Sequence, residues 1–232
     1  MRRKRIVIIG AGGMAREVES TLRWINRCEP AFDFLGYVVS DLSLLGARDT
    51  SDQVIGDLRW LKQNRDSIDA LALGVGSPAA RLKLASELSA SLTGIEWPVL
   101  IHPTAVLDLD SARLEEGCFI GARVTATVNI VLEPFALCNF ASTLGHEARV
   151  GRGSVVNPGA NIAGGVVLGE GVTIGSGAQV LQYLHVGSGA VVGAGAVVTR
   201  NVPEGSTVVG VPARPRAIVE DTAQHREKHY PI

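Results

Sequence analysis

One histidine in the middle of the chain stands beside a carboxylate, a pairing that can carry out general base catalysis. His146 and Glu147 are adjacent, and His146 is the only histidine between Pro103 and Leu184. An imidazole accepts a proton from an attacking amine or hydroxyl near neutral pH, and a carboxylate beside it orients the ring. Adjacent residues of a regular strand face opposite ways, so this pairing requires the backbone to turn here. An inert surface histidine is the alternative interpretation.

Two glycines that follow 18 residues later suggest what this base would act on. Gly164 leaves room for a bound thioester and exposes a backbone N–H beside it. Such a donor stabilises the oxyanion that develops when a thioester carbonyl is attacked. The alternative is that Gly164 and Gly165 only form a tight corner of the chain.

A period of six residues predicts the element that holds these positions. Every sixth residue from Leu114 to Val198 is apolar, without an insertion, and a small or β-branched residue recurs four places further on in most hexads. Three hexads make one coil of 18 residues, so His146 and Gly164 occupy the same place in neighbouring coils. The pattern predicts stacked coils of short parallel strands, in which most residues serve packing alone.

The first 100 residues follow a different pattern, in which short apolar runs alternate with helical segments. This alternation predicts a small open parallel sheet with helices, an α/β domain of Rossmann-like character. The expected strands are 5–9, 34–39, 69–75 and a run near 95–100, and the expected helices are 14–26, 57–64 and one ending near 91.

Polar and glycine residues follow the strands of this predicted sheet. Gly12 and Gly13 lie in a glycine-rich turn after the first strand, and Asp41, Gly76 and Ser77 follow later strands. Ligands bind such sheets at the carboxyl ends of the strands, where a helix N-terminus can hold a phosphate. A tight turn without a ligand is the alternative. A full NAD site is not expected, because about 100 residues supply only half of the usual double βαβ fold.

Length, charge and cysteine usage exclude several classes of protein. The chain has 232 residues, 46% of them hydrophobic, and a net charge of -1, which provides no basic field for nucleic acid. Its apolar runs are too short to span a membrane. Three scattered cysteines argue against a disulfide framework or a zinc cluster, so we expect no metal site. We expect a cytoplasmic protein.

The order of the parts resembles a group of bacterial sugar acetyltransferases, the sialic acid O-acetyltransferase-like and bacillosamine N-acetyltransferase-like enzymes with hexapeptide repeats. The resemblance runs from Val7 to Arg214. It implies a Rossmann-like nucleotide-sugar-binding domain over residues 1–100, a left-handed parallel β-helix over 101–215 and a C-terminal tail over 216–232. The shared elements are the glycine turn, His102-Pro103-Thr104-Ala105, Gly145-His146-Glu147, Pro158-Gly159-Ala160 and the closing Gly210-Val211-Pro212-Ala213-Arg214.

The resemblance also implies a reaction and an assembly. In this group the enzyme is a homotrimer, acetyl-CoA lies between neighbouring β-helices, and the acceptor is the amino group of a nucleotide-linked amino sugar. The acceptor attacks the thioester directly, with His146 as general base and Glu147 supporting it.

Several further residues receive roles from the resemblance alone. Asn139 lines the site, Gly164 and Gly165 meet the thioester of acetyl-CoA, and Arg214 contacts the phosphates of CoA. In the N-terminal domain, Gly12 and Gly13 approach the phosphates of the acceptor, whereas Ser40 or Asp41 meets its base or ribose.

The sequence departs from the group's pattern at two positions and leaves other functions open. Met14 and Val155 stand where the group usually has histidines near the acceptor. An O-acetyltransferase of the sialic-acid type fits the same residues, as does a non-catalytic trimeric scaffold. A nicotinamide oxidoreductase would rest on the glycine turn alone.

Overall fold

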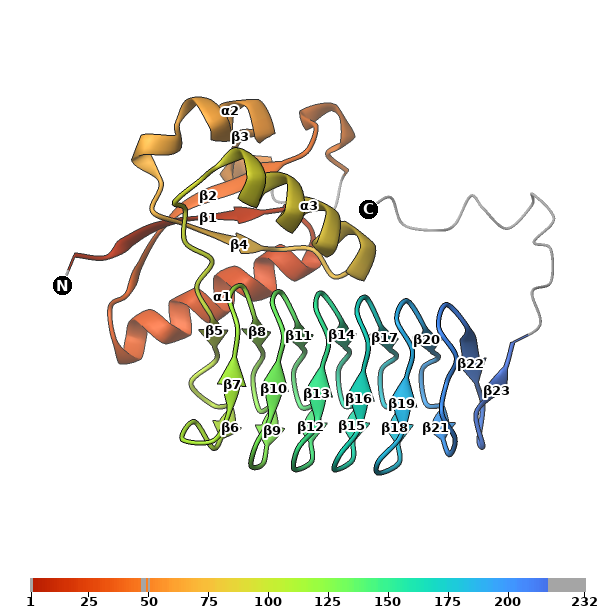
Figure 1. The fold of residues 1–232 in the computed structure, drawn as a ribbon. Coiled ribbons are helices and arrows are strands. Elements are labelled where there is room, and N and C mark those ends of the chain that lie inside the picture. The colour runs from red at the N-terminus through yellow and green to blue at the C-terminus, as the bar shows by residue number, and fades with distance from the viewer. Residues whose placement is uncertain (1, 47–48, 50, 217–232) are drawn as a thin grey trace.

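The chain forms a small α/β layer on top of a long parallel β-helix, seen in a computed structural model (Figure 1). The structure describes residues 2–46, 49 and 51–216. Of the predicted tail, only Arg216 belongs to these residues.

The N-terminal part is a four-stranded parallel sheet with the strand order β3-β2-β1-β4. Its strands are β1 (Lys4–Ile9), β2 (Phe32–Val39), β3 (Val54–Asp57) and β4 (Ala70–Leu73). Its helices are α1 (Gly13–Cys28), α2 (Leu58–Gln63) and α3 (Pro78–Ser91), with short 3-10 turns at Leu42–Leu44, Ser51–Gln53 and Arg65–Ser67.

Most of the predicted N-terminal elements are confirmed within a few residues, with two exceptions. The strand expected near 95–100 is not a strand of this sheet: Glu96 makes an isolated bridge to Ala70, and Leu100 already belongs to the first strand of the β-helix. The sheet gains a strand that the pattern missed, β3, which is short and half-buried along its length.

The second part consists of three sheets of two- or three-residue strands. Sheet 1 contains β5 (Leu100–Ile101), β8 (Phe119–Ile120), β11 (Leu137–Cys138), β14 (Val155–Val156), β17 (Thr173–Ile174), β20 (Val191–Val192), β22 (Thr207–Val209) and the antiparallel β23 (Arg214–Pro215). Sheet 2 contains β6 (Val106–Leu107), β9 (Thr125–Ala126), β12 (Thr143–Leu144), β15 (Asn161–Ile162), β18 (Gln179–Val180) and β21 (Val197–Val198). Sheet 3 contains β7 (Arg113–Leu114), β10 (Val131–Leu132), β13 (Arg149–Val150), β16 (Val167–Leu168) and β19 (His185–Val186).

The six-residue period is confirmed as the repeat of this β-helix. Each leading aliphatic residue ends a strand and points inward, and all of them except the first, Leu114, are buried. Strands pair with their equivalents 18 residues away, as Leu144 does with Ile162. The three sheets form the sides of a three-sided prism, and the turns between them form its three corners. We call the corner made by the turns that join sheet 2 to sheet 3 the 2–3 corner.

The N-terminal domain covers the outer face of sheet 1. Phe119, Leu137 and Val155 project from this face into an apolar cluster with α1, to which Ala15 and Val18 belong. In a three-sided prism the 2–3 corner lies opposite sheet 1. The packing therefore leaves this corner uncovered by the chain's own N-terminal domain.

A buried arginine fixes the same junction. Arg81 of α3 is fully buried, and its Nε and Nη2 atoms donate to the carbonyl oxygen of Phe135 at 3.0 and 2.9 Å. Its Nη1 atom donates to the carbonyl oxygen of Val75 at 2.9 Å. Burial lowers the pKa of Arg81 to about 10, so the guanidinium stays charged at neutral pH and joins α3, the segment that follows β4 and the β-helix.

Candidate active site

His146 and Glu147 lie in the 2–3 corner, where the backbone makes the turn that their pairing requires. Glu147 has a left-handed conformation, with φ at 62°, so the two side chains emerge on the same side. The Nδ1 atom of His146 lies 3.8 Å from Oε2 of Glu147. This separation is an ion-pair distance once the imidazole is protonated, and it is longer than a hydrogen bond.

The other ring nitrogen of His146 faces Gly164 in the next coil. A Cβ atom added to Gly164 would stand 2.3 Å from Nε2 of His146, so only glycine fits beneath the ring. A Cβ atom on Gly145 would stand 2.5 Å from the Gly164 nitrogen, so glycine is also required at position 145, and Gly164 itself is buried. The Gly164 N–H has no hydrogen-bond partner within the described part of the chain.

Gly165 has a left-handed conformation, with φ at 67°, and the ring of another residue packs against it. That ring belongs to Tyr183 in the following coil, and its centroid lies 6.3 Å from that of His146. The two glycines therefore form a corner of the chain against which the rings of His146 and Tyr183 pack.

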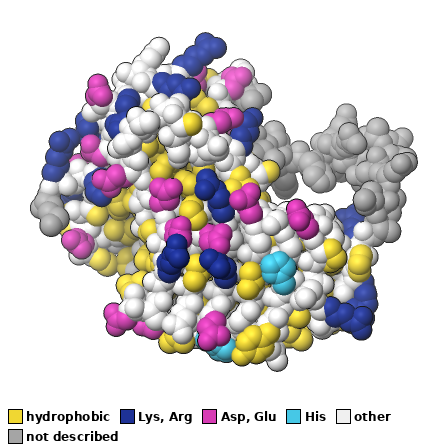
Figure 2. Space-filling view, in the orientation of Figure 1, with side chains coloured by type: hydrophobic (Ala, Val, Ile, Leu, Met, Phe, Trp, Pro, Cys, Tyr) yellow, Lys and Arg dark blue, Asp and Glu magenta, His cyan; other side chains and the backbone are white. Residues whose placement is uncertain are grey.

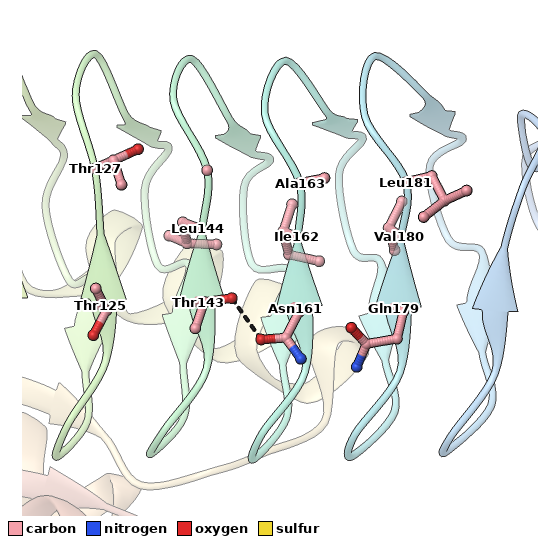
Figure 3. A pocket seen from close by; sticks show the side chains of 11 residues that line it. Thr125, Thr127, Thr143, Leu144, Asn161, Ile162, Ala163, Gln179, Val180 and Leu181 are labelled. Atoms are coloured by element: carbon pink, nitrogen blue, oxygen red, sulfur yellow. Dashed lines mark hydrogen bonds between the residues drawn. The ribbon is translucent and has the colours of Figure 1, made fainter.

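A groove of about 350 Å³ runs along sheet 2 beside this corner (Figure 3). Gly145, Ala163 and Leu181 form its border at the 2–3 corner. Its floor carries threonine and amide side chains from successive coils, where Thr143 donates from Oγ1 to Oδ1 of Asn161 at 2.6 Å. The groove provides an open, mostly apolar channel with a few polar groups.

The carboxyl ends of the N-terminal strands form a second, larger pocket of about 570 Å³. Five of the predicted substrate residues line it, namely Gly12, Gly13, Ser40, Asp41 and Gly76. Gly12 is the N-cap of α1 and offers no side-chain cap, so the first N–H groups of the helix face the pocket. These groups favour an anionic ligand such as a diphosphate.

Asp41 is held ionised at the rim of this pocket. Its Oδ1 atom accepts hydrogen bonds from Oγ of Ser43 at 2.7 Å and from the Ser43 N–H at 2.8 Å. These bonds lower the pKa of the Asp41 carboxyl below its ordinary value. An ionised carboxylate accepts hydrogen bonds from the hydroxyl groups of a ribose or from the N–H groups of a base.

Three other predicted residues lie apart from these two centres. Ser77 is the N-cap of α3, where its Oγ accepts from the Ala80 N–H at 3.5 Å, and it does not line the pocket. Asn139 lies in the turn between sheets 1 and 2, a different corner from His146, and its Oδ1 accepts from the Phe140 N–H. Arg214 is exposed on β23 at the far end of the β-helix.

A single chain therefore does not bring its pocket and its histidine together. The N-terminal domain lies over sheet 1, whereas His146 lies at the opposite corner.

The two positions that depart from the resembled group are apolar in their surroundings as well. Val155 is buried on β14 in the apolar cluster under α1, and Met14 packs against the same cluster. Val155 thus contributes to the junction between the domains, whereas Met14 also lines the N-terminal pocket.

Sequence reasoning missed three residues that stand near these centres. Lys83 lines the N-terminal pocket from α3. Tyr183 and Arg200 lie in the 2–3 corner, one and two coils beyond Gly165, and both are exposed. The signal for the latter two was the 18-residue period, which places Arg200 three coils from His146.

Two classes of feature are not found among the described residues. Over residues 2–46, 49 and 51–216, no group of three or more His, Cys, Asp or Glu side chains is arranged to hold a metal ion. Within the same residues, no helix has the length and apolarity needed to cross a bilayer.

Comparison with known proteins places this architecture among solved structures. Residues 147–182 match the family described as bacterial transferase hexapeptide (six repeats). The chain is similar to PerB from Caulobacter crescentus, solved with CoA and GDP-perosamine, at 31% identity and a TM-score of 0.81 over 91% of this chain and 96% of PerB. No curated protein sequence matches the chain.

Two further solved structures show the same arrangement. The acetyltransferase domain of PglB from Neisseria gonorrhoeae is 30% identical, with a TM-score of 0.80 over 92% of this chain and the whole of that domain. WeeI from Acinetobacter baumannii is 29% identical, with a TM-score of 0.77 over 91% of this chain and 99% of WeeI. These likenesses confirm the predicted fold, an α/β domain followed by a left-handed β-helix.

Proposed function

The chain belongs to the hexapeptide-repeat family of bacterial sugar acetyltransferases, and we propose that it transfers an acetyl group from acetyl-CoA to the amino group of a nucleotide-linked amino sugar. PerB has been solved with CoA and GDP-perosamine, and the PglB domain with acetyl-CoA. The observation that carries the proposal for this chain is the position of His146 Nε2 against Gly164.

The proposed reaction is a direct attack within a ternary complex. The acceptor nitrogen attacks the thioester carbonyl while Nε2 of His146 takes its proton, and a C–N bond forms. The C–S bond then breaks, and the CoA sulfur leaves with the proton that the imidazolium returns. Atoms and charge balance without an acetyl-enzyme or a metal.

The residues around His146 support this role. Glu147 faces Nδ1, which favours the tautomer that carries its proton there and leaves Nε2 free to accept another. The N–H of Gly164 has no hydrogen-bond partner among the described residues, and Gly164 packs against Nε2, so this N–H would donate to the thioester oxygen as negative charge develops. Base and oxyanion donor thus serve the same reacting carbon.

The acceptor would be held through its nucleotide in the N-terminal pocket. The start of α1 at Gly12 and Gly13, together with Lys83, offers donors and positive charge to the diphosphate. Asp41 and Ser40 at the rim offer acceptors to the ribose or the base. Ser77 supports this proposal only indirectly, since it caps the helix that carries Lys83.

The proposal includes a homotrimer in which one chain supplies the pocket and its neighbour supplies His146. The two centres face away from each other within one chain, so an active site needs at least two copies. Asn139, at another corner of the prism, would meet His146 across the same interface.

Charge along the 2–3 corner suggests how acetyl-CoA lies there. The first turn of this corner carries Asp108 and Asp110, whereas its last carries Arg200, with Arg214 beyond. Figure 2 shows basic side chains at this end of the β-helix. Three coils separate His146 from Arg200, about 14 Å along the axis, so the phosphates would lie toward Arg200 while the thioester lies at Gly164 and Gly165.

The proposal is tested by measuring free-thiol release from acetyl-CoA with a panel of UDP-, GDP- and dTDP-linked 3-amino and 4-amino sugars. Matching hydroxy sugars on the same nucleotides would detect O-acetylation. We expect turnover with an amino sugar and its loss, by about 100-fold or more, in His146→Ala. Turnover that survives in the variant would refute the base, and absence of CoA binding would favour a scaffold.

A further inference from the structure

Tyr183 occupies a backbone position that this β-helix gives mostly to glycine. In most turns of the β-helix one residue has a left-handed conformation, and glycine holds the place at Gly153, Gly159 and Gly171, for example. Tyr183 adopts it with φ at 58°, a conformation that bulky side chains rarely take. Arg123 and Ala141 also adopt this conformation, so the backbone alone assigns Tyr183 no role, and its ring is what distinguishes it.

One other aromatic residue shares this conformation and serves as an internal comparison. Phe135 has φ at 61°, and its Cδ1 atom would stand 2.4 Å from a Cβ atom on Gly117 in the coil before. Cδ1 of Tyr183 would stand 2.3 Å from a Cβ atom on Gly165 in the same way. The two rings therefore lie on equivalent glycine seats.

The two rings differ in what covers them. Phe135 is fully buried, with Trp97 packed edge-on against it at 5.2 Å between ring centroids. Tyr183 is 68% exposed, and its hydroxyl has no hydrogen-bond partner among the described residues. The ring of Phe135 is thus covered by Trp97, whereas the ring of Tyr183 is exposed.

Tyr183 lies next to the residues of the proposed reaction. Its ring lies 6.3 Å from that of His146, and its backbone N–H donates to the carbonyl oxygen of Gly164 at 2.9 Å. On its other side the same corner continues to Arg200, and Leu181 beside it borders the groove of sheet 2. Tyr183 thus stands between the reacting centre and the cationic end of the corner.

We propose that Tyr183 is a positioning residue for the acyl donor, with its ring forming the wall along which the pantetheine arm of acetyl-CoA lies. The inference rests on the proposed function. The ring supplies apolar contact to the arm, and the free hydroxyl can exchange a hydrogen bond with one of its amides. By fixing the arm, Tyr183 holds the thioester carbonyl at the Gly164 N–H.

The test compares Tyr183→Gly with Tyr183→Phe. Glycine relieves the left-handed conformation, so the variant should fold at least as stably as the wild type. We expect Tyr183→Gly to raise the KM for acetyl-CoA and the Kd for CoA, measured by calorimetry, about three- to tenfold. The KM for the amino sugar should stay within twofold, and Tyr183→Phe should recover most of the lost affinity.

Two further measurements separate the outcomes. The KM for acetyl-pantetheine should rise in Tyr183→Gly by the same factor as the KM for acetyl-CoA, because the ring contacts the pantetheine arm that both donors share. Arg123→Gly makes the same backbone change in another corner, with φ at 59°, and should leave both donors unaffected.

Three results would overturn the inference. CoA binding that is equal in Tyr183→Gly and wild type would remove the ring from the donor site. A smaller sedimenting species in Tyr183→Gly would show that a second copy of the chain covers the ring. Wild-type protein that binds no CoA would refute the proposed function itself, which the first two results leave intact.

Discussion

The imidazole of His146 lies so close to the backbone of Gly164 that a Cβ atom on Gly164 would stand 2.3 Å from its Nε2 atom. The two residues are 18 positions apart and meet because Leu144 and Ile162 pair in register. The repeat of the β-helix thus sets the distance between the proposed base and the proposed oxyanion donor.

Replacement of Gly164 by alanine should therefore displace the imidazole. We expect Gly164→Ala to lower kcat/KM about 100-fold, because a displacement of about 1 Å at a reacting group has that effect. Thermal unfolding should change little, since the ring is half-exposed and can swing outward. Ser176→Ala, in an equivalent turn, is the control. In a His146→Ala background, Gly164→Ala should not lower kcat/KM further. An additional decrease in kcat/KM there would show that Gly164 acts independently of the ring.

The junction between the domains gives a prediction about stability. Arg81→Met leaves the buried carbonyl oxygen of Phe135 and the half-buried carbonyl oxygen of Val75 without this donor, which we expect to lower the free energy of unfolding by about 2–4 kcal/mol. Arg81→Lys should recover only part of the lost stability, because one ammonium group cannot donate to both carbonyl oxygens as the forked guanidinium does. Denaturant unfolding measures the difference, with the exposed Arg123→Met as control. Equal midpoints for Arg81→Met and wild type would refute this bridging role.

The sequence predicted the repeat far better than the junction that the repeat supports. A strict six-residue period identifies a β-helix because every coil repeats the same burial. The partners of Arg81, in contrast, are backbone carbonyls 6 and 54 residues away, which residue types do not reveal. For the same reason the strand expected near 95–100 was placed in the wrong sheet, since an apolar run does not tell which sheet it joins.

The candidate site was predictable to a similar, partial extent. The pair His146 and Gly164 follows from the period, and the glycine turn at Gly12 follows from the β–α pattern. That one chain separates these two centres depends on which face of the prism the N-terminal domain covers. No local pattern in the sequence encodes that choice.

His102 gives a prediction about pH and stability. It is buried beside Trp24, with 5.6 Å between ring centroids, and its Nδ1 atom accepts from the Thr104 N–H at 3.1 Å. Burial lowers the pKa of His102, so the folded state favours the neutral ring. Its contribution to stability is complete above the unfolded pKa of about 6.5 and is lost as pH falls below that value, because the unfolded chain then binds more protons.

We therefore expect the melting temperature to fall between pH 7 and pH 5, and to fall less in His102→Gln. Calorimetry at several pH values measures the slope. His185→Gln is the matched control, because His185 is exposed on β19. Identical slopes in wild type and His102→Gln would assign the pH dependence to other groups.

The direction proposed for acetyl-CoA can be checked at Arg200, which has no ion pair among the described residues. If Arg200 meets the phosphates, Arg200→Gln should raise the KM for acetyl-CoA about five- to tenfold at low salt. The effect should shrink as ionic strength rises, because salt screens an exposed charge. Acetyl-pantetheine, which lacks the diphosphate, should be used equally well by both proteins, and this separates Arg200 from Tyr183. Arg214→Gln is the necessary comparison. An effect in Arg214→Gln alone would place the phosphates beyond the last coil and require a longer path from Gly164 than three coils provide.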